Sequence, residues 1–572
     1  MTAARTYIQV LLPVKLRWIP TYAAPAPLEP GRRVCVELGG RRYDGVVWRT
    51  IGQPDLPPER IQDIVAVQDD LPDITPEELQ FWAFLAEYYM CTLGEVYKAA
   101  YPLLKLRSEQ TAADILARLQ ERLAKKEQQL AGRHGERVMQ RLKAERDALR
   151  AEIAGYCHPE RSEESGSFGK PQDDKDEARD GSKPQVLTAA SRRENYLPAL
   201  REVLDAGRQA LVLTPEIAFC DRLEGMLAPA FGPQLKVFHS GKTPVQRRAA
   251  AETLRSGAPA VILGTRSALF LPFRRLGLVI VDEEQDPAYK QTEPAPRYHG
   301  RDAAVALAGI HGARVLLAAA VPSLETLLNV RTGKYTSFTV PPSSFGPSSS
   351  LDPSSSLDPS SSAGSSFRHS PAPTGESPRP AEVIDLPAER RKNGLVGTFS
   401  RKLIEAVRAT EGPVLLLRGW EKPEALEAEI RELFPGRDIR IKTWNALARE
   451  GADGAALLGV LQADALVSRD DFRADERAAQ LVGTLCQFAP RVVIQTAVPS
   501  RFNASRSADE LLAERQQFGF PPYTRLVEIR RQGSGEVLQR HFLPRDRTLA
   551  ARKAALLAGL TPGTYPDVDP VD

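Results

Sequence analysis

Short apolar runs alternate with longer segments of mixed polarity between residues 186 and 338, which is the pattern of a parallel α/β sheet. A strand that is buried on both faces is almost continuously hydrophobic, and crossover helices occupy the segments between such strands. We therefore predict an α/β domain over residues 186–338. Its candidate strands are 210–213, 235–238, 260–263, 278–281 and 314–317.

The same alternation returns in residues 381–505 and predicts a second α/β domain. Its candidate strands are 413–417, 439–442, 457–461 and 491–495. The tail, residues 506–572, holds one further strand candidate at 525–530 and is predicted to form part of a small C-terminal domain.

The rest of the chain divides by composition. Residues 1–105 begin with short runs in which apolar and polar positions alternate, and they predict a small, mostly β domain followed by a helix near 76–90. Residues 106–157 carry leucines at helical spacings and predict a long helix or a helical hairpin. We expect two linkers, because 158–185 is charged and poor in apolar residues and 339–380 is dominated by Pro and Ser.

The net charge of the 572 residues is only +3, so the chain as a whole is not a polycation that would bind nucleic acid unspecifically. Residues 1–50 are different, because they hold eight Lys and Arg against three Asp and Glu, a local net charge of +5. A basic surface is therefore expected in the first domain. The candidate DNA-binding residues there are Arg32, Arg33, Arg41 and Arg42.

The five cysteines include no C-x-x-C pair, which argues against a zinc site and against a disulfide framework. A reducing cytoplasm fits this usage. The chain has no apolar run of the roughly 20 residues that a membrane span needs, so we predict a soluble cytoplasmic protein with no membrane partner.

Two carboxylates follow the apolar run 276–281, namely Asp282 and Glu283. Paired carboxylates at the end of a buried parallel strand are where NTPases hold Mg²⁺ and orient the attacking water, so these are the candidate catalytic residues. The usual partner is a glycine-rich phosphate loop. The Gly-Lys-Thr at 241–243 does not supply it, because Lys236 stands where the loop needs its first glycine.

Several short motifs around these carboxylates occur in a fixed order. Together they resemble the family of bacterial primosomal replication-restart helicases (primosomal protein N prime), and weaker matches extend into the first domain and into the second α/β domain. The motifs are Leu213–Ala218, His239–Gly241, Gly264–Phe270, Val281–Asp286, Tyr289–Gln291 and Arg297–Asp302.

The resemblance implies two RecA-like superfamily 2 helicase lobes, the second one eroded, with an N-terminal small β DNA-binding domain for the 3′ end of a strand and a helical insert. It also implies an ATP-dependent 3′-to-5′ DNA helicase of replication restart. Its partners would be stalled forks or other branched DNA, together with primosome or replisome proteins. By this resemblance Ser240, Gly241, Thr265 and Arg266 stand where family members contact the tracking strand.

The chain departs from the family at the nucleotide site. The family's phosphate loop aligns with residues 186–193, where every glycine is missing, and Arg192 and Arg193 replace its lysine and its Mg²⁺-binding threonine. Residues 480–487 replace the segment that supplies arginine fingers. The paired cysteines of the family's zinc site are absent between residues 420 and 464. We therefore expect no cofactor and no zinc.

Three functions remain open from the sequence. The first is a fork-binding replication restart protein that has lost ATP hydrolysis and unwinding, with Asp282 and Glu283 vestigial or acting as caps of a following helix. The second is a divergent but active helicase, in which Asp282 holds Mg²⁺ and Arg192 or Arg193 touches the phosphates of ATP. The third is an assembly protein that uses residues 106–157 and no DNA.

Overall fold

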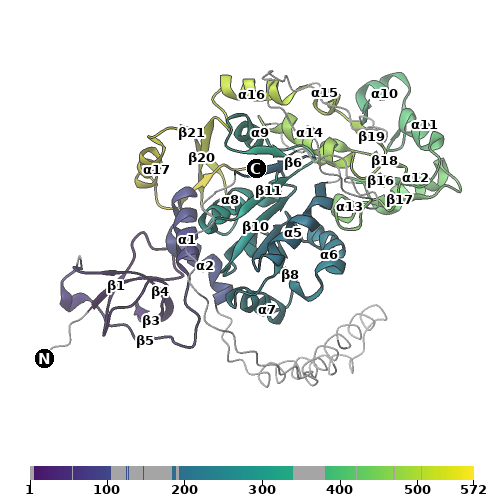
Figure 1. Cartoon of the computed structure of the whole chain (residues 1–572). Coiled ribbons are helices and arrows are strands. Elements are labelled where there is room, and N and C mark those ends of the chain that lie inside the picture. The colour runs from purple at the N-terminus through teal and green to yellow at the C-terminus, as the bar shows by residue number, and fades with distance from the viewer. Residues whose placement is uncertain are drawn as a thin grey trace, which may run out of the picture. The chain divides into compact units, whose positions relative to one another are not determined.

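The computed structural model describes residues 6–54, 56–104, 124, 127, 146, 183–188, 192–338, 381–419, 421–467, 471–503 and 506–571 (Figure 1). Contacts divide the chain into two compact units. The N-terminal unit comprises Met1–Pro76 and Ala100–Arg179, and the large unit comprises Glu77–Ala99 and Asp180–Asp572. The predicted helical segment 106–157 and both predicted linkers lie outside the described residues, apart from 124, 127, 146 and 183–185.

The N-terminal unit contains a five-stranded antiparallel sheet in the order β2-β1-β4-β3-β5. Its strands are β1 (Thr6–Leu11), β2 (Thr21–Ala24), β3 (Arg33–Leu38), β4 (Arg41–Ile51) and β5 (Ala66–Val67), and the short helix η1 (Pro58–Arg60) precedes β5. Strands β3 and β4 form a hairpin closed by Gly39 and Gly40, whose φ angles are 58° and 74°. A two-residue hairpin turn requires positive φ at both central positions, which explains the glycine pair.

Lobe 1 of the large unit contains a seven-stranded sheet in the order β12-β6-β11-β10-β7-β9-β8, and its assigned strand pairs are parallel. The strands are β6 (Gln185–Leu187), β7 (Gln209–Leu213), β8 (Leu235–Phe238), β9 (Val261–Gly264), β10 (Leu276–Asp282), β11 (Arg314–Ala318) and β12 (Thr336–Phe338). The helices are η2 (Arg192–Asn195), α5 (Tyr196–Asp205), α6 (Ile217–Phe231), η3 (Gly232–Gln234), α7 (Pro244–Arg255), η4 (Arg266–Phe270), η5 (Pro287–Tyr289), α8 (Gly300–His311) and α9 (Leu324–Arg331). The helices α1 (Pro76–Tyr88) and α2 (Leu93–Leu104) precede the lobe in the chain.

All seven residues of β10 are buried, because helices cover both faces of the sheet. Residues of α5 and α6 form one core with inward residues of β7, β9 and β10, and α8 packs on β10 from the other side (Figure 1). Burial on both faces is the reason for the unbroken apolar run that marks this strand in the sequence.

Helix α7 begins at Pro244 with a capping box, in which Thr243 and Gln246 exchange hydrogen bonds with each other's backbone. The Gly-Lys-Thr at 241–243 is therefore a helix cap, and Lys242 forms an ion pair with Glu224 at 3.1 Å. The sequence argument against a phosphate loop at this position is consistent with this geometry.

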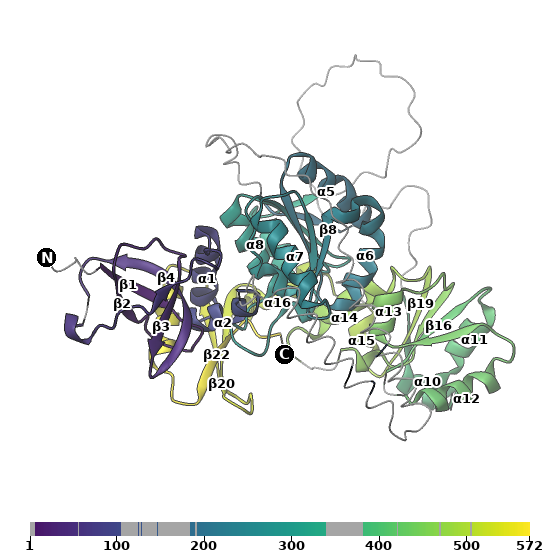
Figure 2. The same ribbon diagram turned by 90° about the horizontal axis from the view of Figure 1, so that it is seen from below.

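Lobe 2 contains a five-stranded parallel sheet in the order β13-β19-β18-β16-β17. Helices cover both faces, with α11 and α12 on one side and α13, α14 and α15 on the other (Figure 2). The elements are β13 (Glu382–Asp385), α10 (Leu386–Lys392), β14 (Leu395–Val396), β15 (Phe399–Ser400), α11 (Arg401–Ala409), β16 (Val414–Leu417), α12 (Pro423–Leu433), β17 (Ile439–Lys442), α13 (Trp444–Glu450), β18 (Leu457–Val460), η6 (Ala463–Ala465), α14 (Ala474–Leu485), β19 (Arg491–Thr496) and α15 (Pro499–Phe502). One hydrophobic core lies on each face of this sheet.

The C-terminal part is a three-stranded antiparallel sheet in the order β21-β20-β22 with two helices. Its elements are α16 (Ala508–Gln517), β20 (Thr524–Arg531), β21 (Val537–Pro544), α17 (Leu549–Ala558) and β22 (Thr564–Val568).

The predicted fold class is confirmed: an α/β chain with two parallel-sheet lobes and a small N-terminal β domain. Each strand predicted in the two lobes is present to within about two residues of its predicted bounds at most ends, as expected for boundaries placed from sequence. Within the described residues, no helix is both long enough and apolar enough to cross a membrane.

Candidate functional site

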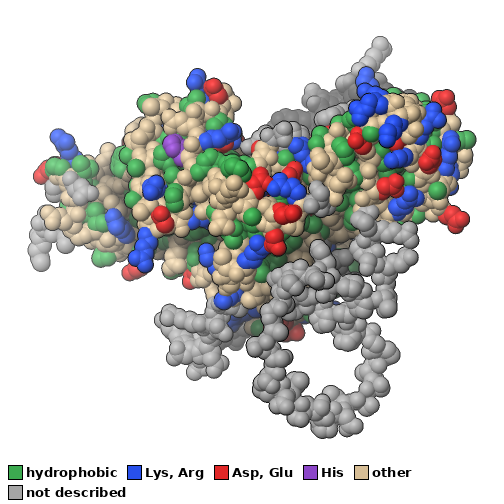
Figure 3. Space-filling view, turned by 90° about the horizontal axis from the view of Figure 1, so that it is seen from above, with side chains coloured by type: hydrophobic (Ala, Val, Ile, Leu, Met, Phe, Trp, Pro, Cys, Tyr) green, Lys and Arg blue, Asp and Glu red, His purple; other side chains and the backbone are tan. Residues whose placement is uncertain are grey.

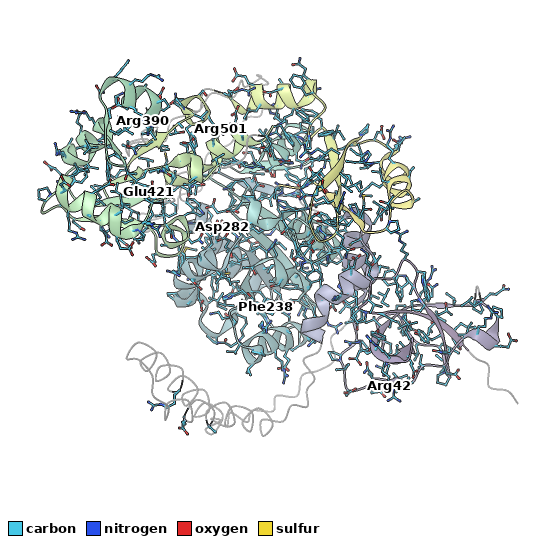
Figure 4. All side chains as sticks on the ribbon, turned by 180° about the vertical axis from the view of Figure 1, so that it is seen from behind. Arg42, Phe238, Asp282, Arg390, Glu421 and Arg501 are labelled. Atoms are coloured by element: carbon cyan, nitrogen blue, oxygen red, sulfur yellow. The ribbon has the colours of Figure 1, made fainter. Side chains whose placement is uncertain are left out.

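Asp282 and Glu283 lie where β10 ends, at the carboxyl edge of the lobe 1 sheet. Strand register pairs Asp282 with Ala318 of β11, and Val281 with Leu213 of β7, so the carboxylates lie between the ends of two neighbouring strands. Glu283 has a φ of 52°, which turns the chain sharply after the strand. Asp282 is 0% and Glu283 2% exposed. Figure 4 labels Asp282 in the interior of the large unit.

The guanidinium of Arg193 lies directly against both carboxylates. Its Nε lies 3.2 Å from each carboxylate oxygen of Asp282, and its Nη2 donates to Asp282 Oδ2 at 2.9 Å. The same Nη2 donates to Glu283 Oε1 at 2.8 Å. A planar guanidinium that binds two carboxylates in this way is a strong, charge-assisted arrangement. The structure therefore brings together three of the residues singled out in the sequence.

Further hydrogen bonds fix the same carboxylates. Tyr196, at the start of α5, donates its hydroxyl to Asp282 Oδ1 at 2.7 Å. Gln285 donates to Glu283 Oε2 at 2.9 Å. The hydroxyl of Tyr289 lies within hydrogen-bond distance of the carbonyl oxygens of Leu213 and Asp282. Neither Tyr196 nor Tyr289 is among the predicted site residues, although Tyr289 lies in one of the motifs that carry the resemblance.

The electrostatics keep Arg193 charged. Burial lowers the pKa of Arg193, but the charges of Asp282 and Glu283 raise it by more, so that it lies above its usual value. Nearby, burial and the charges of Glu216 and Glu283 raise the pKa of Asp286 to about 7, although its bond from the backbone N–H of Ala288 lowers it. The site therefore holds a permanent cation between two buried anions.

A magnesium–nucleotide complex does not fit these residues as they stand. The metal would need Asp282 and a hydroxyl from the position of Arg193, but the guanidinium lies where the metal's charge would be. The segment before α5 is the 3₁₀ helix η2, and the glycines that would let backbone N–H groups converge on phosphates are absent. Arg192 also lies in η2, but its side chain is outside the described set.

The suggestion that Asp282 and Glu283 cap a following helix is wrong. A turn follows Glu283, and the next helical element is η5, whose first backbone donor is capped by Asp286: the N–H of Ala288 donates to Asp286 Oδ1 at 2.8 Å. The two carboxylates are occupied by Arg193 instead.

The third acidic residue, Glu284, is also fully occupied. It accepts from the backbone N–H of Ser323 at 2.7 Å and from the side chains of Ser323, Thr326 and Arg301, each at 3.0 Å. The sequence did not indicate this network, because Arg301, Ser323 and Thr326 lie 17 or more residues from Glu284 in the chain.

The four predicted DNA contacts of lobe 1 lie at the same sheet edge. Register pairs Phe238 of β8 with Gly264 of β9, so that Ser240–Gly241 and Thr265–Arg266 follow strands that end side by side. Ser240 and Gly241 are exposed, and Thr265 and Arg266 are half-buried. Gly264 allows this approach, because a Cβ there would lie 2.5 Å from the Phe238 carbonyl oxygen.

Two polar nitrogens at this edge have no hydrogen-bond partner among the described residues, namely Arg266 Nη1 and His239 Nε2. Burial and the charge of Lys242 lower the pKa of His239, so its ring is neutral. The carbonyl oxygen of Arg266 accepts from the hydroxyl of Tyr298 at 3.1 Å, which fixes the backbone of this residue. Both nitrogens are buried, so neither is exposed at the edge as the structure stands.

The four arginines predicted to form a basic surface in the N-terminal unit differ in exposure. Arg41 and Arg42 are exposed at the start of β4, beside the glycine turn, and Figure 4 labels Arg42 on the outside of its unit. Arg32 forms ion pairs with Asp69 and, at 3.2 Å, with Asp73. Arg33 is only 1% exposed, so the expectation that it lies on the surface is wrong. Arg33 precedes Val34 in β3, and the packing of this strand buries the Arg33 side chain despite its charge.

The face in Figure 3 shows Lys and Arg side chains interspersed with Asp and Glu, without one continuous basic area. This mixture agrees with the small net charge of +3. Attraction to DNA would therefore depend on local groups of arginines rather than on the field of the whole chain.

Comparisons with known proteins give the following findings. The protein-family model of the PriA 3′DNA-binding domain (3′BD) matches residues 9–102. The replication restart protein PriA of Haemophilus influenzae is 30% identical over 373 residues, which cover 57% of this chain and 51% of that protein. PriA of Chlamydia pneumoniae is 42% identical over 154 residues, 26% of this chain and 20% of that protein. The structure of RecG bound to a three-way DNA junction covers 66% of this chain and 47% of that chain at 14% identity, with a TM-score of 0.33.

The chain spans about half the length of these relatives at most. The family match nevertheless spans residues 9–102, and the match to the Haemophilus influenzae protein covers more than half of the chain. The resemblance predicted from the sequence motifs is confirmed: the chain is similar to the replication restart proteins PriA and carries a match to the model of their 3′DNA-binding domain.

Proposed function

We propose that this chain is a DNA-binding protein of replication restart that binds forked or branched DNA without ATP hydrolysis or unwinding. A DNA-binding role in replication restart agrees with its relatives and with the match at residues 9–102. The loss of ATP-driven activity is a proposal about this chain's own residues. It is carried by one observation, the guanidinium of Arg193 on Asp282 and Glu283.

That observation bears on catalysis in two ways. In an NTPase the two carboxylates hold the metal and the water that attacks the γ-phosphate, and both groups here are hydrogen-bonded to Arg193. In addition, the arginine would have to leave two buried anions before a metal could approach, and breaking a buried ion pair costs about 3–5 kcal/mol. Binding of a magnesium–nucleotide complex would have to supply that free energy.

DNA binding does not share this requirement, because phosphate contacts need only donors and positive charge. Arg41 and Arg42, which are exposed in the N-terminal unit, are the groups whose donors support such contacts best. Arg32 is weaker, because two carboxylates already neutralise it.

The first test is ATP turnover in the presence of forked DNA. We expect no hydrolysis above background, and we expect Glu283→Gln to behave like the parent protein, because Glu283 is already engaged by Arg193. Hydrolysis that Glu283→Gln abolishes would contradict the proposal and support a divergent helicase.

The second test is the salt dependence of fork binding, measured by fluorescence anisotropy. Neutralising Arg41 and Arg42 together, as Arg41→Gln with Arg42→Gln, is expected to weaken binding and to lower the log–log salt slope by about 1–2 units, since each lost phosphate contact removes roughly one. The matched control is Arg390→Gln with Arg391→Gln, a second pair of adjacent exposed arginines, on α10. Binding that shows no salt dependence would favour an assembly protein that does not use DNA.

A further inference from the structure

The two lobes are joined by a contact that uses only the protein's own side chains. Helix α14 of lobe 2 packs against residues 320–326 of lobe 1, and we call this region the lobe contact. At its centre the backbone of Gly483 approaches Val321 closely: a Cβ added to Gly483 would lie 2.4 Å from Val321 Cγ2. A contact this tight leaves no room for another group between the two segments.

Buried charges cross the lobe contact and are satisfied there. Glu476, on α14, is 7% exposed and accepts from the backbone N–H of Leu324, the first residue of α9, at 2.9 Å. Its other oxygen accepts from Arg515 at 2.8 Å. A carboxylate at a helix N-terminus is favoured by the unpaired backbone donors there. Lobe 2 therefore supplies the anion that caps a lobe 1 helix.

A second interaction, an ion pair, crosses the lobe contact. Arg473, the residue before α14, donates to Glu325 of α9 at 3.1 Å. Burial raises the pKa of Glu325, but the charges of Arg473, Arg301 and Arg515 lower it by more. The net result is a pKa of about 2. The carboxylate is thus held charged by cations from both lobes.

The same network reaches the candidate site. Ser323, next to the lobe contact, binds Glu284 through both its backbone N–H and its hydroxyl, and Glu284 follows Asp282 and Glu283 directly. The backbone segment Ser323–Leu324 therefore links the end of β10 to α14 of lobe 2, because Ser323 binds Glu284 and Leu324 binds Glu476. Arg222 of α6 adds a separate contact, with its guanidinium 5.2 Å from the ring centroid of Phe488 in lobe 2.

We propose that lobes 1 and 2 are permanently joined without nucleotide. Arg193 neutralises the carboxylates of the candidate site, and the charged groups that link the two lobes belong to the lobe contact itself. This inference rests on the proposed function and deepens it. It states that nucleotide would not regulate this site. The DNA-contact edge of lobe 1 would then stay in one arrangement, and affinity for DNA would not respond to ATP. The alternative is a pair of lobes that separate and close on nucleotide binding.

The geometry at Gly483 offers a direct test. A Cβ on Gly483 would lie 3.6 Å from the Cβ of Val321, within the range of about 3.5–4.5 Å found across disulfide bonds. The variant Gly483→Cys with Val321→Cys should therefore form a bond between the lobes under mild oxidation. Cys486→Ser in the same background removes the nearby native thiol on that helix, and each single cysteine variant serves as a control.

We expect the bond to form at the same rate with and without an ATP analogue, as followed by non-reducing electrophoresis and by mass spectrometry of the linked peptides. We also expect the oxidised and reduced forms to bind forked DNA with equal affinity. Bond formation that needs nucleotide, or an affinity that changes on reduction, would overturn the inference. Neither result depends on ATP turnover, so failure of the inference and failure of the proposed function can be told apart.

A wedge variant provides a second measurement. Gly483→Leu is expected to force the lobes apart and to raise amide hydrogen exchange in α14 and in residues 320–326, while the strands inside each lobe stay protected. Gly309→Leu is the control, because Gly309 also lies within a helix but a Cβ there meets nothing within 4 Å. Equal exchange in both variants at the lobe contact would show that the lobes are not held together there.

Discussion

Replacing Arg193 by alanine is expected to destabilise lobe 1 by about 3–5 kcal/mol, because the change removes the cation from two buried carboxylates. Asp282 and Glu283 have side-chain exposures of 0% and 3%, and water cannot replace the guanidinium freely at such depth. Arg193→Lys keeps a positive charge but loses the planar fork, so we expect a smaller loss. Urea denaturation combined with hydrogen exchange of the β10 amides would measure both effects.

The control for this prediction is Arg314→Ala in the same lobe. Arg314 pairs with Glu202 at 2.9 Å, but their side chains are 39% and 66% exposed, and an exposed ion pair is worth less than about 1 kcal/mol. If Arg193→Ala costs no more than Arg314→Ala, the ion pair is not what stabilises the site. The proposed explanation for a loss of ATP hydrolysis would then fail with it.

Replacing Lys290 by methionine is expected to have a similarly large effect, at the junction between lobe 1 and the C-terminal sheet. The side chain of Lys290 is 0% exposed, and its Nζ lies 2.8 Å from Asp567 Oδ1. Nζ also donates to the carbonyl oxygens of Arg297 and Val568, each at 2.6 Å. Removal would leave the carboxylate and two carbonyls without this donor, at a cost of about 3 kcal/mol or more, and should expose β22 to limited proteolysis.

Two further variants test whether that effect comes from the buried ion pair. Lys242→Met removes a partly exposed lysine, paired with Glu224 at 3.1 Å, and is expected to cost less than about 1 kcal/mol. The double change Lys290→Met with Asp567→Leu removes both buried charges and should recover part of the lost stability, since a buried pair can often be replaced by apolar groups. A double variant as unstable as the sum of the single ones would mean that the two residues are not coupled.

Nine strands of the two lobes could be predicted from the sequence because each is a short run dominated by apolar residues, whereas β6, β12, β13, β14 and β15 have no predicted counterpart. The predicted strands 235–238 and 439–442 coincide with β8 and β17. Helices on both faces impose an almost continuous apolar run on the central strands, whereas the edge strands β8 and β17 each include at least one basic residue. The prediction was weakest where a residue type conflicts with its position, as at Arg33, whose charge suggested a surface that the packing of β3 does not provide.

The candidate site was predicted only in its components. The sequence identified Asp282 and Glu283 from the end of a strand, and Arg193 from its alignment with a metal-binding threonine. It did not indicate that these side chains bind one another, because 89 residues separate Arg193 from Asp282. The position of Arg33 and the Glu284 network were beyond local reasoning for the same reason.

The order of apolar and polar residues by itself determined the class of fold, the position of nine of the fourteen strands described in the two lobes, and the absence of a glycine-rich loop. The tertiary structure decided which charges meet. Parallel strands that are distant in the chain end at a common edge, and their register fixes which side chains face each other there. The pairing of Arg193 with Asp282 and Glu283, and of Glu476 with α9, depends on that three-dimensional arrangement, which no local pattern encodes.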